Sequence, residues 1–172
     1  SILNLFLGQP IESIEEEYVN WNFEDHKIIK ELNMNSLFSG LKLKENVLND
    51  FLVLSSKSKL WSRHDKREFL NYSEVEAYNS KNDKPCCVLF LTDPKLKDLS
   101  YKIARDKNLL RIAKSQIGRV SKIDTLVQWS PVCESDYNWR NKQQTIDFHF
   151  DAHGLNFLYI FFYFSVCSKD TG

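Results

Sequence analysis

The chain contains 172 residues, 42% of them hydrophobic, and its 23 basic and 23 acidic side chains give a formal net charge of zero. This length suits one domain with a sizeable core, so we expect a single globular domain over residues 1–172, with residues 79–85 as a possible loop or linker. The neutral charge excludes a strong overall field toward nucleic acid or an anionic membrane.

The charged residues are unevenly distributed along the chain. Residues 1–40 carry seven acidic and two basic side chains, for a sum of −5, whereas residues 85–125 carry four acidic and nine basic ones, for a sum of +5. The five glycines lie far apart, at positions 8, 40, 118, 154 and 172. A phosphate-binding loop needs several neighbouring glycines, so the common nucleotide-binding motifs are excluded.

The first part of the chain favours helices. Pro10 opens a predicted helix over residues 11–20, which has acidic side chains in its first turns. A second helix is predicted from Glu24 to about Phe38, with Gly40 just past its end. The acidic side chains of the first helix form a candidate partner-binding surface, and the alternative is an ordinary solvated face. The candidate residues are Glu12, Glu15 and Glu16.

The middle of the chain combines ambiguous and clear patterns. Residues 41–60 fit either a helix face or a buried strand, and residues 72–78 fit an outer strand. Residues 86–91 form an apolar run of strand length. The next signal is Asp93, a typical N-cap residue before a helix that begins at Pro94.

We expect the helix that begins at Pro94 to end near residues 106–108 and a second strand to follow over residues 109–113. This order makes a βαβ unit whose strands are parallel and whose crossover is right-handed. The alternative is one helix that continues to Ile117, with Gly118 as its C-cap. Such a helix would need burial on two sides, so we prefer the break.

Two segments suggest contacts with macromolecules. The basic residues of segment 95–122 could bind nucleic acid, but they are spread around most of the helical circumference, which favours a role in solubility. Tyr137 and Trp139 lie in a polar loop, where aromatic side chains can stack a base or anchor a protein interface. The alternative is that these two side chains pin the loop to the core.

The C-terminal part predicts an antiparallel β-hairpin. Residues 143–150 alternate between polar and apolar side chains, which is typical of a half-buried strand. Residues 151–154 have the composition of a tight turn. Residues 155–164 include nine apolar or aromatic side chains, so we expect a strand that is buried on both faces at the centre of the core.

Four polar side chains of this hairpin form a candidate metal site. Side chains two apart on a strand point to the same side, so two of them can converge on a divalent metal such as zinc or manganese. Such a site suits a metal-dependent hydrolase or nuclease. The alternative is an ordinary turn next to the polar face of a half-solvated strand. The candidate ligands are Asp147, His149, Asp151 and His153.

The four cysteines, at positions 86, 87, 133 and 167, show no metal-ligand spacing. We expect reduced core thiols in a soluble, cytoplasmic protein. Residues 1–10 lack the positively charged start of a secretory signal. The longest apolar run, residues 155–167, is shorter than the roughly 20 residues of a membrane helix, so no membrane contact is expected.

These patterns predict an α/β fold, or a mixed α+β one. We expect a mixed sheet with a C-terminal antiparallel hairpin and one βαβ unit, and helices concentrated toward the N-terminus. For function we expect a non-catalytic macromolecule-binding protein of the inhibitor, immunity or adaptor kind, which binds another protein and needs no cofactor. It would act through the acidic helical surface and the aromatic loop. The alternatives are the metal-dependent hydrolase or nuclease and a nucleic-acid-binding module.

Overall fold

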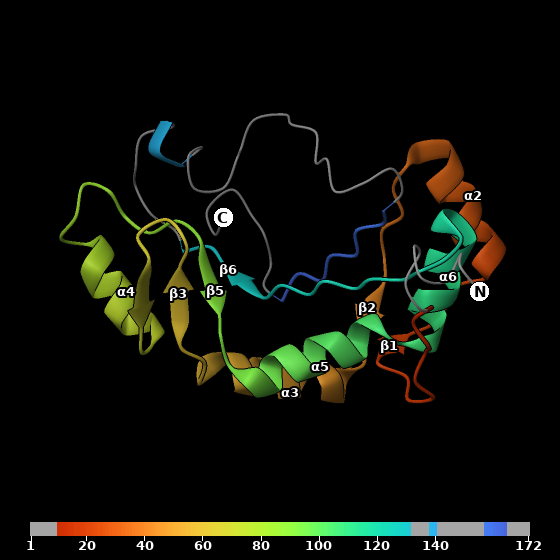
Figure 1. The fold of residues 1–172 in the computed structure, drawn as a ribbon, viewed down its shortest axis with the longest axis horizontal. Coiled ribbons are helices and arrows are strands. Elements are labelled where there is room, and N and C mark those ends of the chain that lie inside the picture. Colours follow the sequence, from red (N-terminus) through yellow and green to blue (C-terminus); the bar gives the residue numbers. More distant parts are fainter. Residues whose placement is uncertain (1–9, 132–137, 141–156, 165–172) are drawn as a thin grey trace, which may run out of the picture. The chain divides into compact units, whose positions relative to one another are not determined.

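A computed structural model describes residues 10–131, 138–140 and 157–164 (Figure 1). The chain divides into two compact units, which are described separately. The first unit contains Ser1–Leu48, Leu99–Thr125 and His153–Phe162. The second unit contains Asn49–Asp98, Leu126–Ala152 and Tyr163–Gly172. The fold is mixed α and β, as predicted, and the prediction of a single domain stays a prediction.

The first unit is built around two helices that pack against each other, α2 (Asp25–Asn35) and α6 (Lys107–Ile117) (Figure 1). Helix α2 ends at Ser36, which adopts a left-handed conformation, and the Ser36 N–H donates to the Leu32 carbonyl. Two short strands, β1 (Val19–Asn20) and β2 (Lys42–Leu43), pair antiparallel. This unit therefore holds a helical pair and a two-stranded ribbon.

A buried carboxylate joins the ribbon of the first unit to α6. Asp106 is fully buried and caps the N-terminus of α6, because its Oδ1 accepts hydrogen bonds from the N–H groups of Asn108 at 2.8 Å and Leu109 at 3.4 Å. Its Oδ2 accepts from the N–H groups of Tyr18 at 2.7 Å and Val19 at 3.2 Å. One side chain thus satisfies four backbone donors from two distant segments.

The second unit contains a four-stranded sheet in the order β4-β3-β5-β6, in which every neighbouring pair is antiparallel. The strands are β3 (Leu60–Ser62), β4 (Arg67–Phe69), β5 (Leu89–Leu91) and β6 (Gln128–Trp129). Helix α4 (Tyr72–Asn79) follows β4 and packs against it.

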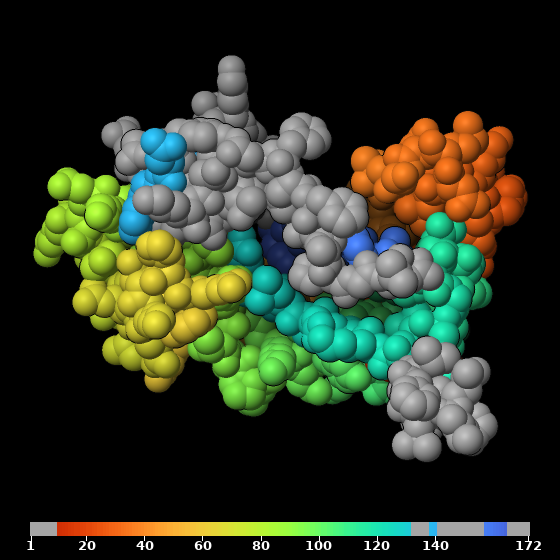
Figure 2. All heavy atoms as spheres, turned by 45° about the horizontal axis from the view of Figure 1, so that its top comes forward, coloured from red at the N-terminus to blue at the C-terminus, as the bar shows by residue number. Residues whose placement is uncertain are grey.

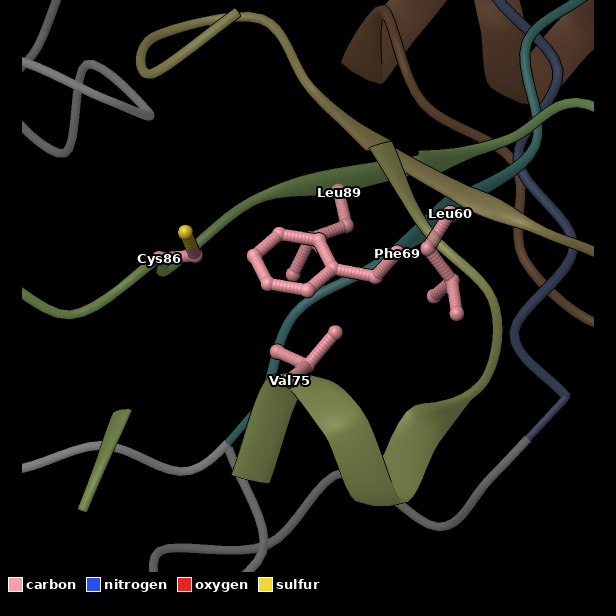
Figure 3. Packing of buried hydrophobic residues seen from close by; sticks show 5 residues of the cluster. All are labelled: Leu60, Phe69, Val75, Cys86 and Leu89. Carbon is pink, nitrogen blue, oxygen red and sulfur yellow. The ribbon is translucent and has the colours of Figure 1, made fainter. Parts of the chain in front are cut away.

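One apolar cluster holds the sheet of the second unit to α4. In Figure 3 the ring of Phe69 lies between Leu89 of the sheet and Val75 of α4, with Leu60 and Cys86 on either side. All five side chains are almost completely buried. The strand register explains why side chains of the sheet meet in this cluster. Leu60 pairs with Phe69 on one side and with Leu91 on the other, so these three residues share one face of the sheet.

Two further helices carry residues of both units: α3 (Glu45–Ser56) and α5 (Pro94–Ala104). Helix α3 settles the ambiguity over residues 41–60 in favour of a helix. Helix α5 confirms the predicted start at Pro94, because the Asp93 carboxylate accepts from the N–H groups of Lys95 and Leu96. Helix α2 likewise confirms the helix predicted from Glu24.

The predicted βαβ unit is wrong, although its helix exists. Residues 109–113, predicted as a strand, belong to α6, where Leu109, Leu110, Ile112 and Ala113 are all buried. The predicted break is confirmed near residue 106, and the alternative C-cap at Gly118 is confirmed as well, because its N–H donates to the Lys114 carbonyl. With a second helix in place of the strand, the predicted parallel strand pair does not form, and the described sheets are antiparallel rather than mixed.

Two other local predictions are wrong. Residues 11–20 are extended rather than helical, because the N–H groups of Ile11 and Ile14 donate to the carbonyls of Val120 and Arg105 instead of to their own turn. Residues 72–78 form helix α4 rather than a strand. Asn71 caps that helix by accepting from the Glu74 N–H, and the Glu74 carboxylate accepts from the Leu70 N–H. With α5 and α6 in the middle of the chain, the helices are not concentrated toward the N-terminus.

The predicted C-terminal hairpin is described only in part. Its first strand and turn lie outside the described residues. Within 157–164 there is no strand, and five large side chains of this segment are exposed, so the prediction of a doubly buried central strand is wrong there. The central places of the sheet are filled by β3 and β5, which pair with each other and with the outer strands.

The structure also describes the two adjacent cysteines, the segment after α4 and the helices. Cys86 and Cys87 are buried, and neither forms a disulfide. Residues 80–88 form a loop between α4 and β5, and both elements belong to the second unit. Among the described helices, none has the length and apolar character that crossing a membrane requires.

We predict that Asp106→Ala lowers the free energy of unfolding by about 3–5 kcal/mol, because it leaves four backbone donors at a buried position without their acceptor. Asp106→Asn keeps one side-chain oxygen as an acceptor, so it should lower the free energy of unfolding by about half as much. The measurement is urea denaturation followed by circular dichroism. Asp124→Ala is the matched control, because this carboxylate is 78% exposed, and it should change the value by less than about 0.5 kcal/mol. Equal stability of the Asp106 and Asp124 variants would contradict the role assigned to Asp106.

Candidate functional site

The predicted partner-binding residues do not form one surface within either unit. Glu12, Glu15 and Glu16 are exposed, as predicted, but they lie on an extended segment of the first unit and not on a helix. Trp139 belongs to the second unit, and Tyr137 lies outside the described residues. The acidic candidates and Trp139 therefore belong to different units.

Two acidic side chains of the first unit, Glu17 and Asp25, pair with basic residues of the same unit. Glu17 lies 2.8 Å from the Lys107 ammonium and 3.3 Å from that of Lys44, and these two hydrogen bonds lower the pKa of Glu17. Asp25 accepts from both Nε and Nη2 of Arg111, the latter at 2.8 Å. The Arg111 bonds lower the pKa of Asp25 and raise that of Arg111.

These ion pairs explain the opposite charges of the two sequence segments. The acidic N-terminal segment supplies Glu17 and Asp25, and the basic segment 95–122 supplies their partners on α6. Arg105 also donates to the backbone carbonyl of Glu12, at 3.0 Å. Fewer cations of the basic segment are then left for phosphate groups, which weakens the nucleic-acid hypothesis.

Trp139 is attached to the second unit by three contacts. Its indole N–H donates to the Pro85 carbonyl at 2.9 Å, and its ring packs edge-on against His64, with 4.6 Å between the ring centroids. The Lys84 ammonium lies 5.4 Å from the centroid of the same ring. With the ring half-buried and its polar group bonded, this geometry favours the alternative in which the loop is pinned to the core.

A polar cluster of the second unit contains the side-chain types of a nucleophilic site. The Asp65 Oδ2 accepts from the Ser62 hydroxyl at 2.8 Å and from the Cys86 thiol at 2.9 Å. Burial and the bond to Asp65 raise the pKa of Cys86 to about 12. The thiol is therefore protonated at neutral pH and is a poor nucleophile, since the thiolate is the reactive form. The cluster instead links the turn after β3 to the segment before β5.

The candidate metal ligands Asp147, His149, Asp151 and His153 lie outside the described residues, so the metal site stays a prediction. In the part of the chain that the structure describes, no group of three or more His, Cys, Asp or Glu side chains is placed to hold a metal ion. A zinc or manganese site with three protein ligands would thus include at least one residue from 1–9, 132–137, 141–156 or 165–172.

The described C-terminal segment carries a row of exposed aromatic rings. We call Phe157, Tyr159 and Phe161 of the first unit the aromatic ladder. Neighbouring ring centroids are 5.2 Å and 5.7 Å apart, and the side chains are 39%, 45% and 71% exposed in chain order. Leu158, which lies between Phe157 and Tyr159 in the sequence, packs on the cluster of Leu110, Ala113 and Val120. Part of this segment, coloured blue, reaches the surface in Figure 2.

The alternation continues into the residues that belong to the second unit. Tyr163 is 75% exposed, whereas the ring of Phe164 stacks parallel to Phe51, with 4.0 Å between the centroids. The odd-numbered side chains of residues 157–163 are exposed, but Ile160 is 39% exposed as well, so the segment differs from the predicted strand with two buried faces. The sequence contains a signal for the exposure of the odd-numbered side chains. Both tyrosines of residues 157–164, whose rings carry a polar hydroxyl, occupy odd positions.

No family model, curated protein or solved structure matches the chain. The case for any function therefore rests on the geometry of the chain itself.

We predict that native Cys86 resists alkylation. A pKa of about 12, against an ordinary value of 9.0, makes the thiolate roughly a thousandfold rarer at pH 8, and burial slows the reaction further. The test is pulsed iodoacetamide labelling read by peptide mass spectrometry, with urea-unfolded protein as the reactive reference. Asp65→Asn should react faster than wild type, because the carboxylate that raises the pKa is gone. Labelling of native Cys86 at the unfolded rate would refute this account.

We predict a small, salt-sensitive coupling between Asp25 and Arg111, of about 0.5–1 kcal/mol, since the pair is largely exposed. The folded pKa of Asp25 is lowered, so its contribution is present above the unfolded carboxyl pKa and is lost as the pH falls through the folded value. A double-mutant cycle with Asp25→Asn and Arg111→Met, measured by urea denaturation at pH 7 and pH 3, checks the sign. A larger coupling free energy at pH 3 than at pH 7 would contradict the stabilising role of the ionised Asp25 carboxylate.

Proposed function

We propose that this chain is a non-catalytic protein-binding module and that the aromatic ladder is its contact surface. The observation that carries the proposal is the exposure of three neighbouring aromatic side chains on one side of the 157–164 segment. Contiguous exposed apolar patches of a few hundred Å² are commonly functional on a monomer.

The composition of the ladder supports a protein as the partner. Aromatic residues are enriched in protein interfaces, and tyrosine in particular combines a large apolar ring with a hydrogen-bonding tip. A phosphate-binding surface needs cations, whereas residues 155–168 contain no Lys or Arg. A protein partner is therefore better supported than nucleic acid.

The acidic residues can contribute to the rim of the same surface. Ile11, directly before Glu12, packs on the cluster of α6 and following residues that also holds Leu158. Both the acidic segment and the ladder are thus anchored on one apolar cluster of the first unit. Exposed charges around an apolar centre mainly affect association rate and specificity. This arrangement is compatible with an inhibitor, an immunity protein or an adaptor, none of which needs a cofactor.

The proposal predicts that Phe161→Ser abolishes partner capture while it leaves folding intact. Tagged wild-type and variant proteins are compared in pull-downs from cells, with captured proteins identified by mass spectrometry. Leu37→Ser is the matched control, because Leu37 of the first unit is 68% exposed, close to the 71% of Phe161. Unchanged urea midpoints show that both variants fold.

Partner capture should be lost with Phe161→Ser and kept with Leu37→Ser, because only the first substitution removes a side chain of the aromatic ladder. The proposal fails if the wild-type protein captures nothing, itself included, or if Phe161→Ser captures the same proteins as wild type.

A further inference from the structure

We infer that the second unit carries a binding surface for single-stranded nucleic acid, on the face of its sheet opposite to α4. Bases stack on the rings of Trp61 and Phe90, and phosphates contact Arg63 and Lys66. We call these four residues the sheet surface. The inference goes beyond the proposed function, because it uses no residue of the aromatic ladder. It also differs from the nucleic-acid hypothesis for segment 95–122, whose basic residues it does not use.

The strand register places the two aromatic rings side by side. Trp61 of β3 pairs with Phe90 of β5, and their rings stack with 6.3 Å between the centroids and 29° between the planes. Leu60 and Leu89, their neighbours in the sequence, point to the other face and pack in the apolar cluster with α4. An antiparallel sheet needs only one buried face, so the core does not require aromatic side chains on the second one.

The face that carries the rings is open at its outer strands. Glu68 of β4, which pairs with Trp61, has a side chain that is 50% exposed, and Gln128 of β6, which pairs with Phe90, is exposed as well. The two rings themselves are half-buried. Neighbouring rings of this kind can stack successive unpaired bases whatever their sequence, because every base has a π-face. Bases of a duplex are already paired and stacked, so the geometry favours a single strand.

The charge of the β3–β4 hairpin complements a phosphate backbone. Residues 57–67 carry five basic side chains and one acidic one, for a sum of +4. The acidic side chain, Asp65, accepts from the Ser62 hydroxyl and the Cys86 thiol. Arg63 and Lys66 are exposed, and no carboxylate in the described part of the chain pairs with either. These cations are therefore available to phosphate groups. The rings favour nucleic acid over an acidic peptide, which has no bases to stack.

A second loop of the same unit holds the turn of the hairpin. The ring of His64, between Arg63 and Lys66, packs edge-on against Trp139, and the Lys84 ammonium lies 5.4 Å from the centroid of the same Trp139 ring. Lys84 is exposed, so these contacts add a third cation near the turn. Groups that are already in place lose less conformational freedom when they bind, which favours affinity.

Fluorescence anisotropy with labelled oligonucleotides tests the surface directly. Single strands of about 12 nucleotides, as DNA and as RNA, are titrated with the full chain at about 50 mM and 200 mM salt. The wild-type protein should bind at least one of them, more weakly at the higher salt, and should bind a DNA duplex of equal length at least about tenfold more weakly. No binding of either single strand at the lower salt, or equal binding of the duplex, would overturn the inference.

Removal of the turn cations tests the phosphate contacts. The double variant Arg63→Ala with Lys66→Ala should weaken binding and reduce the slope of log affinity against log salt by about 1.4, since each phosphate contact contributes about 0.7 on a single strand. Lys27→Ala with Lys122→Ala is the matched control, because it removes the same charge from exposed side chains of the first unit and should leave binding unchanged. Equal losses in the two double variants would show that only net charge matters and would refute the assigned contacts.

Substitution of Trp61 tests the stacking. Trp61→Leu should weaken binding at least about fivefold and leave the salt slope unchanged, whereas Trp61→Phe, which keeps a ring, should retain most of the affinity. Urea midpoints show whether both variants fold, and the cation variants decide the question if Trp61→Leu does not. Unchanged affinity of folded Trp61→Leu, or competition by polyglutamate as strong as that by the unlabelled oligonucleotide, would leave no role for base stacking and would reject the inference.

Discussion

The first unit depends on one buried carboxylate. Burying a carboxylate is costly unless its oxygens are hydrogen-bonded, and at Asp106 two backbone N–H groups meet each oxygen. The same side chain starts α6 and fixes Tyr18 and Val19, which lead into the two-stranded ribbon. The start of α6 in turn sets which side chains line its apolar face, and Leu110 and Ala113 of that face hold Leu158 of the ladder segment. The Asp106 cap of α6 is thus connected to the exposed aromatic surface through a continuous series of contacts.

Ion pairs of the first unit join the acidic N-terminal segment to α6. A segment with a sum of −5 would ordinarily suggest a basic partner, but Glu17 and Asp25 pair with Lys107 and Arg111 from the segment with a sum of +5. Exposed pairs of this kind contribute little energy individually, yet they disfavour arrangements that place like charges together. The opposite charges therefore help to bring the N-terminal segment to α6, and the apolar ladder is left as the better candidate for external binding.

Signals that act within a few residues are predictable from the sequence, whereas signals that depend on distant partners are not. Asp93 and Gly118 mark helix ends correctly, since a cap bonds to backbone groups of its own helix. Asn71 and Glu74 give an equally local signal for α4, which the prediction of a strand over residues 72–78 missed. The extended path of Ile14, in contrast, depends on the carbonyl of Arg105, which no local pattern around Ile14 reveals.

The sequence predicts a strand buried on both faces over residues 155–164, so it does not identify the exposed side chains of the candidate site. A run of apolar and aromatic residues indicates burial but does not determine which of its side chains meet the protein. Polar residues in place of Phe157, Tyr159 and Phe161 would leave Leu158 packed on its cluster and would remove an aggregation hazard. The packing of Leu158 by itself does not require aromatic side chains at these three positions. A partner protein that covers them, as proposed above, would recover the hydrophobic free energy that exposure to water forfeits.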